Sequence, residues 1–170
     1  MEVVELDSFG SEDWNALIDG EQEAWGGTGE GLHWQDKDRH MGIRSESGGL
    51  LAAGGLAVAS VQVPGSPEFE VVGVGGVIVH RSVRRRGLAT RLLGGLLALA
   101  ATMGPDRAML FCRPELLAFY ERLGFREIKA PVRAQQPGGE IEMPMRSAWL
   151  PLLGSPVWPE GPVTVRGLPF

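Results

Sequence analysis

Three consecutive arginines, Arg84 to Arg86, are followed by Gly87 and then by a long apolar segment that begins at Leu88. The N-terminus of a helix already carries partial positive charge, so a cationic cluster beside it indicates that something negative binds there. Small residues at Gly87 and Ala89 let a ligand approach the unpaired amides of the first helical turn. The pattern predicts an anion site, and a pyrophosphate fits its charge and its several donors.

Two plainer explanations of the arginine cluster stay open, namely a basic surface loop and a nucleic-acid patch. A single cluster in a chain of net charge −5, with no aromatic residues between the arginines, is weak support for nucleic acid, and we expect none to bind. The glycine-rich stretch "GVGGVI" (73–78) lies inside an expected strand, not between a strand and a helix. A dinucleotide-binding fold is therefore disfavoured.

The elements that must position this loop follow from apolar periodicity and turn signals. Strands are expected at 2–7, 40–44, 50–63, 69–80, 107–112, 125–128 and 141–150, with "RAQQPGGE" (133–140) as a loop. Helices are expected over 11–24 with Ser11 as the cap, over 88–103, and from Pro114 to Gly124. This order predicts an α/β fold with a mixed, mostly antiparallel sheet of six to seven strands, a central parallel pair and flanking helices.

The composition fits one globular domain. The 170 residues are 44% hydrophobic and 22% charged, which is ordinary for a soluble protein. We expect residues 1–150 to form the domain and the proline- and tryptophan-rich tail, 151–170, to pack on it as an irregular segment. A single cysteine, an acidic N-terminus without signal-peptide features and the lack of an apolar run of roughly 20 residues predict a cytoplasmic protein that does not bind membranes.

Two segments together resemble the GNAT superfamily of acyl-CoA-dependent N-acyltransferases. That family's pattern is Arg or Gln, two residues, Gly, one residue, and Gly or Ala, and residues 84–89 match it directly after the strand "GGVIV". An aromatic-rich helix, "LLAFYERLGF" (116–125), then follows in the family's order. The resemblance covers residues 69–128 best and implies acetyl-CoA as co-substrate. The cofactor-binding residues that it implies are Val77, Ile78, Val79, Arg84, Arg85, Arg86, Gly87, Leu88, Ala89 and Thr90.

Tyr120 is the only tyrosine in the chain. Helical spacing places it on one face with Leu116 and Leu123, so it could be a half-buried packing residue. By the resemblance, it stands where the family keeps its general acid. Its hydroxyl would then hydrogen-bond or protonate the thiolate that leaves when an amine attacks the thioester. Arg113 stands where many relatives have an asparagine that contacts the cofactor.

The acceptor is predicted from charge and from a weaker likeness. The segments "HWQDKD" (33–38) and "VGGVIVHRSVRRRGL" (74–88) and the Pro/Trp tail resemble the aminoglycoside 2'-N-acetyltransferase group, although Gly75 stands where those enzymes carry a glutamate. Residues 1–40 contain eleven Asp or Glu against two Lys or Arg. Such a field attracts cations, so we expect a small cationic primary amine as the acceptor, held by Trp34, Asp36 and Glu70.

Without the family glutamate, a general base would come from elsewhere. Besides Asp36 and Glu70, the candidates are five residues that are equally explained as ordinary polar side chains: Glu30, His33, Asp38, His40 and His80. Cys112 ends a buried strand and is expected in the core, and no cluster has metal-ligand spacing, so no catalytic metal is predicted. Transfer to a protein or peptide amine, binding of acyl-CoA without turnover, and a homodimer all stay open.

Overall fold

The computed structural model describes residues 1–21, 29 and 31–170, and within this part ten strands form one mixed sheet. The strands are β1 (Val3–Leu6), β2 (Arg39–Arg44), β3 (Leu50–Gln62), β4 (Phe69–Val79), β5 (Arg107–Cys112), β6 (Arg126–Glu127), β7 (Val132–Gln136), β8 (Gly139–Glu142), β9 (Arg146–Pro151) and β10 (Val163–Arg166). The α-helices of this part are α1 (Ser11–Ile18), α2 (Leu88–Ala100) and α3 (Leu117–Arg122), and short 3₁₀ turns at Arg81–Val83 and Pro114–Leu116 precede the last two.

The sheet runs in the order β6-β9-β5-β4-β3-β10-β7-β8, and β2 joins β1 to β3. Strand β3 pairs with β2 through its first half and with β10 near its end, so one long strand connects the two halves of the sheet. Strands β4 and β5 are parallel, as are β10 and β7. The predicted mixed α/β fold with a central parallel pair is therefore confirmed, but the sheet has more strands than the six to seven expected.

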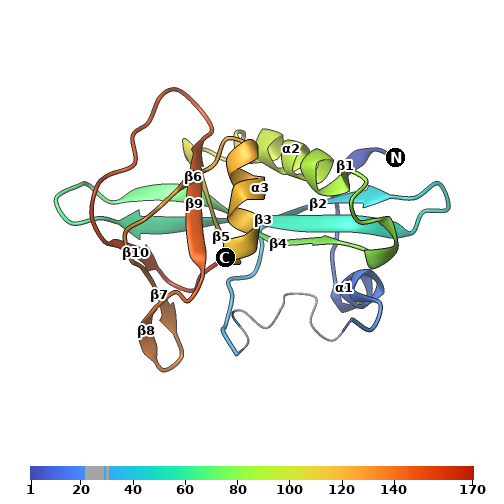
Figure 1. Ribbon diagram of the computed structural model, residues 1–170, viewed down its shortest axis with the longest axis horizontal. Coiled ribbons are helices and arrows are strands. Elements are labelled where there is room, and N and C mark those ends of the chain that lie inside the picture. The colour runs from blue at the N-terminus through green and yellow to red at the C-terminus, as the bar shows by residue number, and fades with distance from the viewer. Residues whose placement is uncertain (22–28, 30) are drawn as a thin grey trace.

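Helices cover both faces of the β2–β4 region, with α2 on one side and α1 on the other (Figure 1). The buried face of α2 packs Leu92, Leu93 and Leu96 against the sheet with no exposed surface. A Cβ added to Gly54 would meet Leu96, so position 54 faces α2. Because side chains alternate along a strand, Gly55 faces the side of α1.

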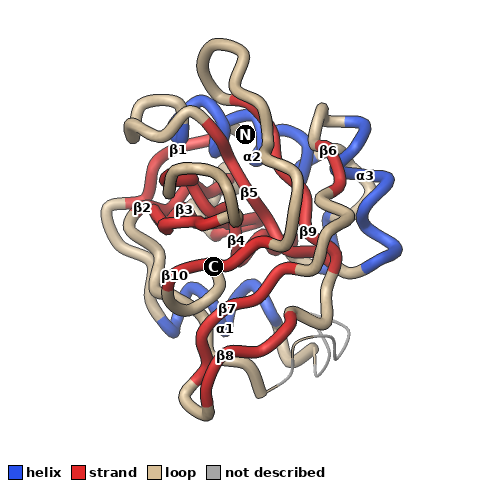
Figure 2. The backbone as a smooth tube through the Cα atoms, turned by 90° about the vertical axis from the view of Figure 1, so that its left-hand side faces the viewer, coloured by secondary structure: helices blue, strands red, loops and turns tan. Residues whose placement is uncertain are grey.

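Three strands beyond the seven expected, β7, β8 and β10, account for the difference in strand number. The expected loop at 133–140 is instead the turn of a β7–β8 hairpin, because Val132 and Ala134 alternate inward and Pro137-Gly138-Gly139 supplies the turn. The expected irregular tail contains β10, whose Val163 and Val165 are fully buried between β3 and β7 (Figure 2). In both places a short alternation of apolar and polar residues produced a strand.

Helix α1 is shorter than the expected 11–24. Ser11 is its first residue and not its cap; Gly10 precedes the helix, and the Gly10 amide donates to Asp13 Oδ2 at 3.0 Å. Asp19 closes the helix in a left-handed conformation with φ 47°. Residues 22–24 of the expectation lie outside the described residues. Within the described chain, no helix has the length and apolar character required to cross a bilayer.

Candidate active site

The arginine loop places two residues in left-handed backbone conformations, Arg85 with φ 63° and Gly87 with φ 79°. Gly87 is the N-cap of α2, no side chain caps the helix, and its first turn contains no acidic residue. A Cβ added at Gly87 would meet nothing within 4 Å. Left-handed turns that lead into an uncapped helix direct successive amides toward one point, and this arrangement binds anions.

The three arginines have different roles in this loop. The Arg84 guanidinium donates to Glu21 Oε1 at 2.9 Å and to the Val79 carbonyl at 3.0 Å, so it ties the loop to the end of β4. Its hydrogen bond lowers the pKa of the Glu21 carboxyl. Arg85 and Arg86 are exposed and form no ion pair with the described residues. They, and not Arg84, are free to meet a phosphate.

Strand β4 contains a bulge and then an unpaired edge. Gly75 lies opposite Gly55, but Ile78 lies opposite Ala53, so the two residues 76 and 77 of β4 face one residue of β3. Gly76 adopts φ 60° there. On its other side, β4 pairs with β5 only from Val72 to Val74. Among the described strands, none pairs with the β5-facing edge of β4 over residues 75–79. Apart from the Val79 carbonyl, which accepts from Arg84, this leaves main-chain groups available to an extended ligand.

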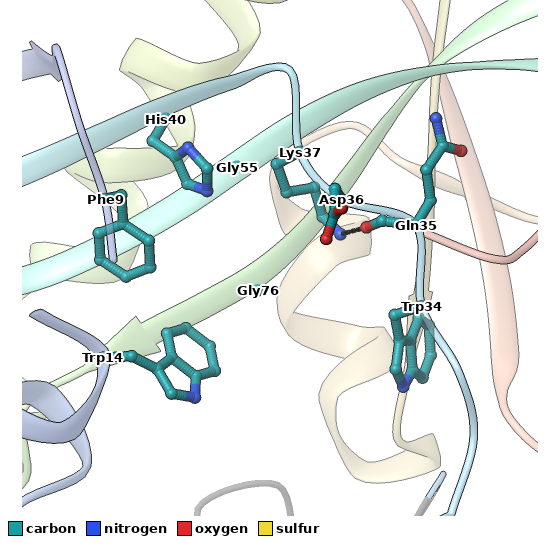
Figure 3. A pocket seen from close by; sticks show the side chains of 9 residues that line it. All are labelled: Phe9, Trp14, Trp34, Gln35, Asp36, Lys37, His40, Gly55 and Gly76. Atoms are coloured by element: carbon teal, nitrogen blue, oxygen red, sulfur yellow. Dashed lines mark hydrogen bonds between the residues drawn. The ribbon is translucent and has the colours of Figure 1, made fainter. Parts of the chain in front are cut away.

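A cavity of about 410 Å³ adjoins this bulge on the side of α1. Figure 3 shows aromatic rings and the His40 imidazole gathered on one side, Trp34 on the other, and Gly76 on the strand between them. The nine lining residues are Phe9, Trp14, Trp34, Gln35, Asp36, Lys37, His40, Gly55 and Gly76. The cavity therefore joins the first helix, the 34–37 segment and the bulged strand at one point.

Lys37 and His40 give this cavity an unusual electrostatic character. The Lys37 ammonium donates to the Gln35 carbonyl at 2.8 Å, and burial lowers its pKa against the opposing effect of Asp36 and Asp38. The His40 ring stacks on Phe9 with centroids 4.8 Å apart. Burial and then the positive charge of Lys37 lower the pKa of His40. Both groups are shifted toward their neutral forms.

The structure explains why position 75 is a glycine. A Cβ there would lie 2.7 Å from the carbonyl carbon of Phe170 and 2.9 Å from Cε of Lys37. At Gly73, a Cβ would lie 2.1 Å from the Phe170 ring, which packs across the strand and is 2% exposed. A carboxylate side chain at position 75 would have to displace Phe170 and Lys37.

Tyr120 lies on the other face of the sheet, in the core that α2 covers. It is 8% exposed and packs its ring between Phe119 and Phe125, with centroids 5.1 and 5.8 Å away. Burial raises the pKa of Tyr120 to about 12, with a smaller contribution from Cys112. The hydroxyl therefore carries its proton at every physiological pH. No described residue makes a hydrogen bond to it.

The sequence-predicted acceptor residues divide into two groups. Trp34 and Asp36 line the cavity, whereas Glu70 is exposed opposite Ser60, five residues along β4 from Gly75. Among the other candidate bases, His40 is in the cavity and Glu30 lies outside the described residues. The remaining three lie outside the cavity lining: Asp38 accepts from the Val58 amide, His80 contacts Ser82, and the His33 main chain bonds the Gln136 side chain.

Six of the residues that line the cavity were not among the predicted site residues, namely Phe9, Trp14, Gln35, Lys37, Gly55 and Gly76. The signal for Lys37 was its position inside the acidic and aromatic "HWQDKD" segment, but no role was predicted for Lys37 itself. Phe9 and Trp14 flank the start of α1, and apolar residues at such positions usually indicate packing. Only the fold brings these residues to the bulge.

These features define an acetyltransferase fold of the GNAT type. The central strand β4 has a bulge and lies beside a parallel strand, and an arginine- and glycine-rich loop connects it to an uncapped helix. Residues 5–128 match the model of the acetyltransferase (GNAT) domain, and the chain belongs to this family. The family resemblance predicted from residues 84–89 and the aromatic helix is therefore confirmed. No curated protein matches the chain.

Solved structures share the fold at low sequence identity. The GNAT family N-acetyltransferase YhbS from Escherichia coli in complex with CoA is 16% identical, with a TM-score of 0.60 over 96% of this chain and 89% of its own. An aminoglycoside 6'-N-acetyltransferase complexed with coenzyme A is 14% identical, with a TM-score of 0.61 over 92% of this chain and 100% of its own. Escherichia coli ElaA is 18% identical, with a TM-score of 0.57 over 88% and 98%. The likeness to the aminoglycoside 2' group stays a prediction.

Proposed function

We propose that the protein transfers the acetyl group of acetyl-CoA to the primary amine of a small cationic acceptor, by direct transfer in a ternary complex. The observation that carries this proposal is the contact between two features: the largely aromatic cavity, which Asp36 also lines, opens on Gly76, at the bulge where β4 gains an unpaired edge. An extended donor on that edge and an amine in the cavity would meet at the same residues.

The described residues fit acetyl-CoA in its charge and shape. The amides of residues 85–90 form the anion-binding turn, Arg85 and Arg86 supply free positive charge, and Gly87 leaves open space above the helix. The free edge of Val77 to Val79 would pair with the extended pantetheine arm as an added strand. When bound, acetyl-CoA supplies an activated thioester. On the opposite face, Tyr120 would hold its proton ready for the sulfur that leaves.

The cavity favours a small cationic acceptor. Its walls include three aromatic rings, from Phe9, Trp14 and Trp34, whose faces attract cations. The Asp36 carboxylate adds a negative charge to the lining. An open cavity of about 410 Å³ suits a small molecule, whereas a protein or peptide amine would need an elongated groove.

The direct test is release of free CoA thiol from acetyl-CoA, measured against a panel of polyamines, aminoglycosides, amino acids and peptides. We expect turnover with one class of small cationic amines, and mass spectrometry should find one acetyl group on the product. Selective turnover of peptides would favour the protein-amine alternative. Tight acetyl-CoA binding without turnover of any amine would favour a binding module instead.

A further inference from the structure

We propose that His40 is the base that takes the proton from the acceptor's ammonium group. This inference rests on the proposed function and deepens it, because a cationic amine must lose a proton before its nitrogen can attack a thioester. A carboxylate at position 75 of β4 is blocked here by Phe170 and Lys37, so a base at that position is excluded. His40 is the imidazole among the residues that line the cavity.

The position of His40 suits this role. It lies opposite Gly55 in the pairing of β2 with β3, and its Cδ2 atom lies 3.1 Å from the point that a Gly55 Cβ would occupy. The absence of a side chain at Gly55 therefore leaves the ring against the cavity floor. Phe9 fixes the ring plane by stacking. No described residue forms a hydrogen bond with either ring nitrogen, so both are available to a ligand.

The charges around His40 keep it neutral and able to accept a proton. From the 34–38 segment, Lys37 faces it directly, and its positive charge opposes protonation of the ring. Asp36 and Asp38 flank Lys37 and moderate that charge. From the β1 side, Glu5 is paired with Arg39. Phe9 and Trp14 add uncharged walls, and Gly55 and Gly76 contribute only main chain.

The proton balance is simple. The acceptor arrives as an ammonium ion, and neutral His40 takes one proton from it and later releases that proton to water. The free amine then forms the new N–C bond as the C–S bond of the thioester breaks. The second nitrogen proton is lost as the amide forms, and one proton in total goes to the departing sulfur, supplied through Tyr120. The products are an amide, a neutral thiol and one proton in solution.

Lys37 is the other basic group in the cavity, and it is a positioning residue here. Its Nζ donates to the Gln35 carbonyl, and the neighbouring Asp36 and Asp38 carboxylates favour its charged form against the effect of burial on its pKa. Its charge disfavours protonation of His40, and it disfavours in the same way the charged form of an amine bound beside it. Lys37 would thus lower the pKa of both the donor and the acceptor of the proton without receiving the proton itself.

The test combines titration of the resting protein with kinetics. In the NMR spectrum of the free protein, we expect the His40 ring to titrate below the ordinary histidine pKa of about 6.5. In Lys37→Met, that pKa should rise, because one of its two lowering causes is gone. With the best amine, the acidic limb of the pH profile of kcat/KM should follow the pKa of the His40 ring in the wild type. In Lys37→Met this limb should move to higher pH.

His40→Gln should lose that limb, and kcat/KM at neutral pH should fall about 10²- to 10⁴-fold. Acetyl-CoA affinity should stay unchanged, which also shows that the variant folds. His33→Gln, at an exposed histidine outside the cavity, is the matched control and should behave as wild type. If His40→Gln kept the acidic limb of the wild-type kcat/KM profile, or if Lys37→Met did not move that limb, the role of His40 would be overturned while the acetyl transfer would stand. A wild-type protein that acetylates no amine would overturn both.

Discussion

A pair of substitutions at Gly87 separates helix stability from cofactor binding. Gly87 is the N-cap of α2, in a left-handed conformation with open space around it. Asn and Asp tolerate this conformation better than other residues, and they differ by one negative charge at nearly the same size. Gly87→Asp should be more stable than Gly87→Asn by about 0.3–1 kcal/mol, because a carboxylate complements the helix dipole.

Acetyl-CoA affinity should change in the opposite direction. A carboxylate about 4 Å from a phosphate charge is opposed by about 1 kcal/mol in bulk water and about 4 kcal/mol near a protein surface. The loop is exposed, so a penalty near the lower limit applies, and we expect about 5- to 30-fold weaker binding by Gly87→Asp than by Gly87→Asn at low salt. The difference should shrink as salt is added.

Calorimetric titration of acetyl-CoA and thermal unfolding of both variants make the comparison. The Asn variant is the control, since it carries the same backbone strain without the charge. If the two variants bind acetyl-CoA equally while Asp raises the melting temperature, the uncapped turn of α2 does not receive the pyrophosphate. The assignment of the arginine loop would then be withdrawn, although the helix-capping argument would survive.

Three further predictions concern other parts of the molecule. Tyr120→Phe keeps the ring packing and removes the proton donor, so single-turnover acetyl transfer should slow about 10²- to 10⁴-fold with unchanged acetyl-CoA affinity; a wild-type rate would return Tyr120 to a packing role. In α2, the Cβ of Gly94→Ala meets open space, so this variant should be more stable than the wild type by about 0.5–1 kcal/mol. The Cβ of Gly95→Ala would lie 2.6 Å from Val3, so urea unfolding should find this variant less stable than Gly94→Ala by about 1–3 kcal/mol. The KM of the acceptor should rise with ionic strength, and Asp36→Asn should reduce that dependence; a KM insensitive to salt would remove the electrostatic argument.

The sequence predicted most of the strands and the loop that carries the anion site, because both depend on local patterns. Apolar runs bounded by turn residues gave β3, β4 and β5 with bounds that agree within a residue, and the loop motif is contiguous. The β7–β8 hairpin and β10 were missed, because each has only four or five residues and its alternation is short. Such strands depend on their neighbours in the sheet more than on their own sequence.

The composition of the cavity could not be predicted in the same way. Its walls come from the start of α1, the 34–37 segment and the β4 bulge, which are far apart in sequence. Glu70 was selected because it shares a strand with Gly75, but five residues of extended chain cover roughly 16 Å. No role was predicted for Lys37, and only the approach of Gly55 and Gly75 shows that its stem is buried against the strand.

Burial raises the pKa of the titratable side chain on one face of β4 and lowers the pKa of those on the other face. The proposed chemistry needs both shifts. On the α2 face, a low-dielectric core raises the pKa of Tyr120 and keeps a neutral proton donor there. On the α1 face, burial lowers the pKa of Lys37 and His40 and keeps a neutral proton acceptor beside the bulge. Desolvation always disfavours the charged form, so the same physical effect yields an acid where the group is a phenol and a base where it is an imidazole. A thioester held along β4 would lie between the two, with the amine's proton removed on one side and the sulfur's proton supplied on the other.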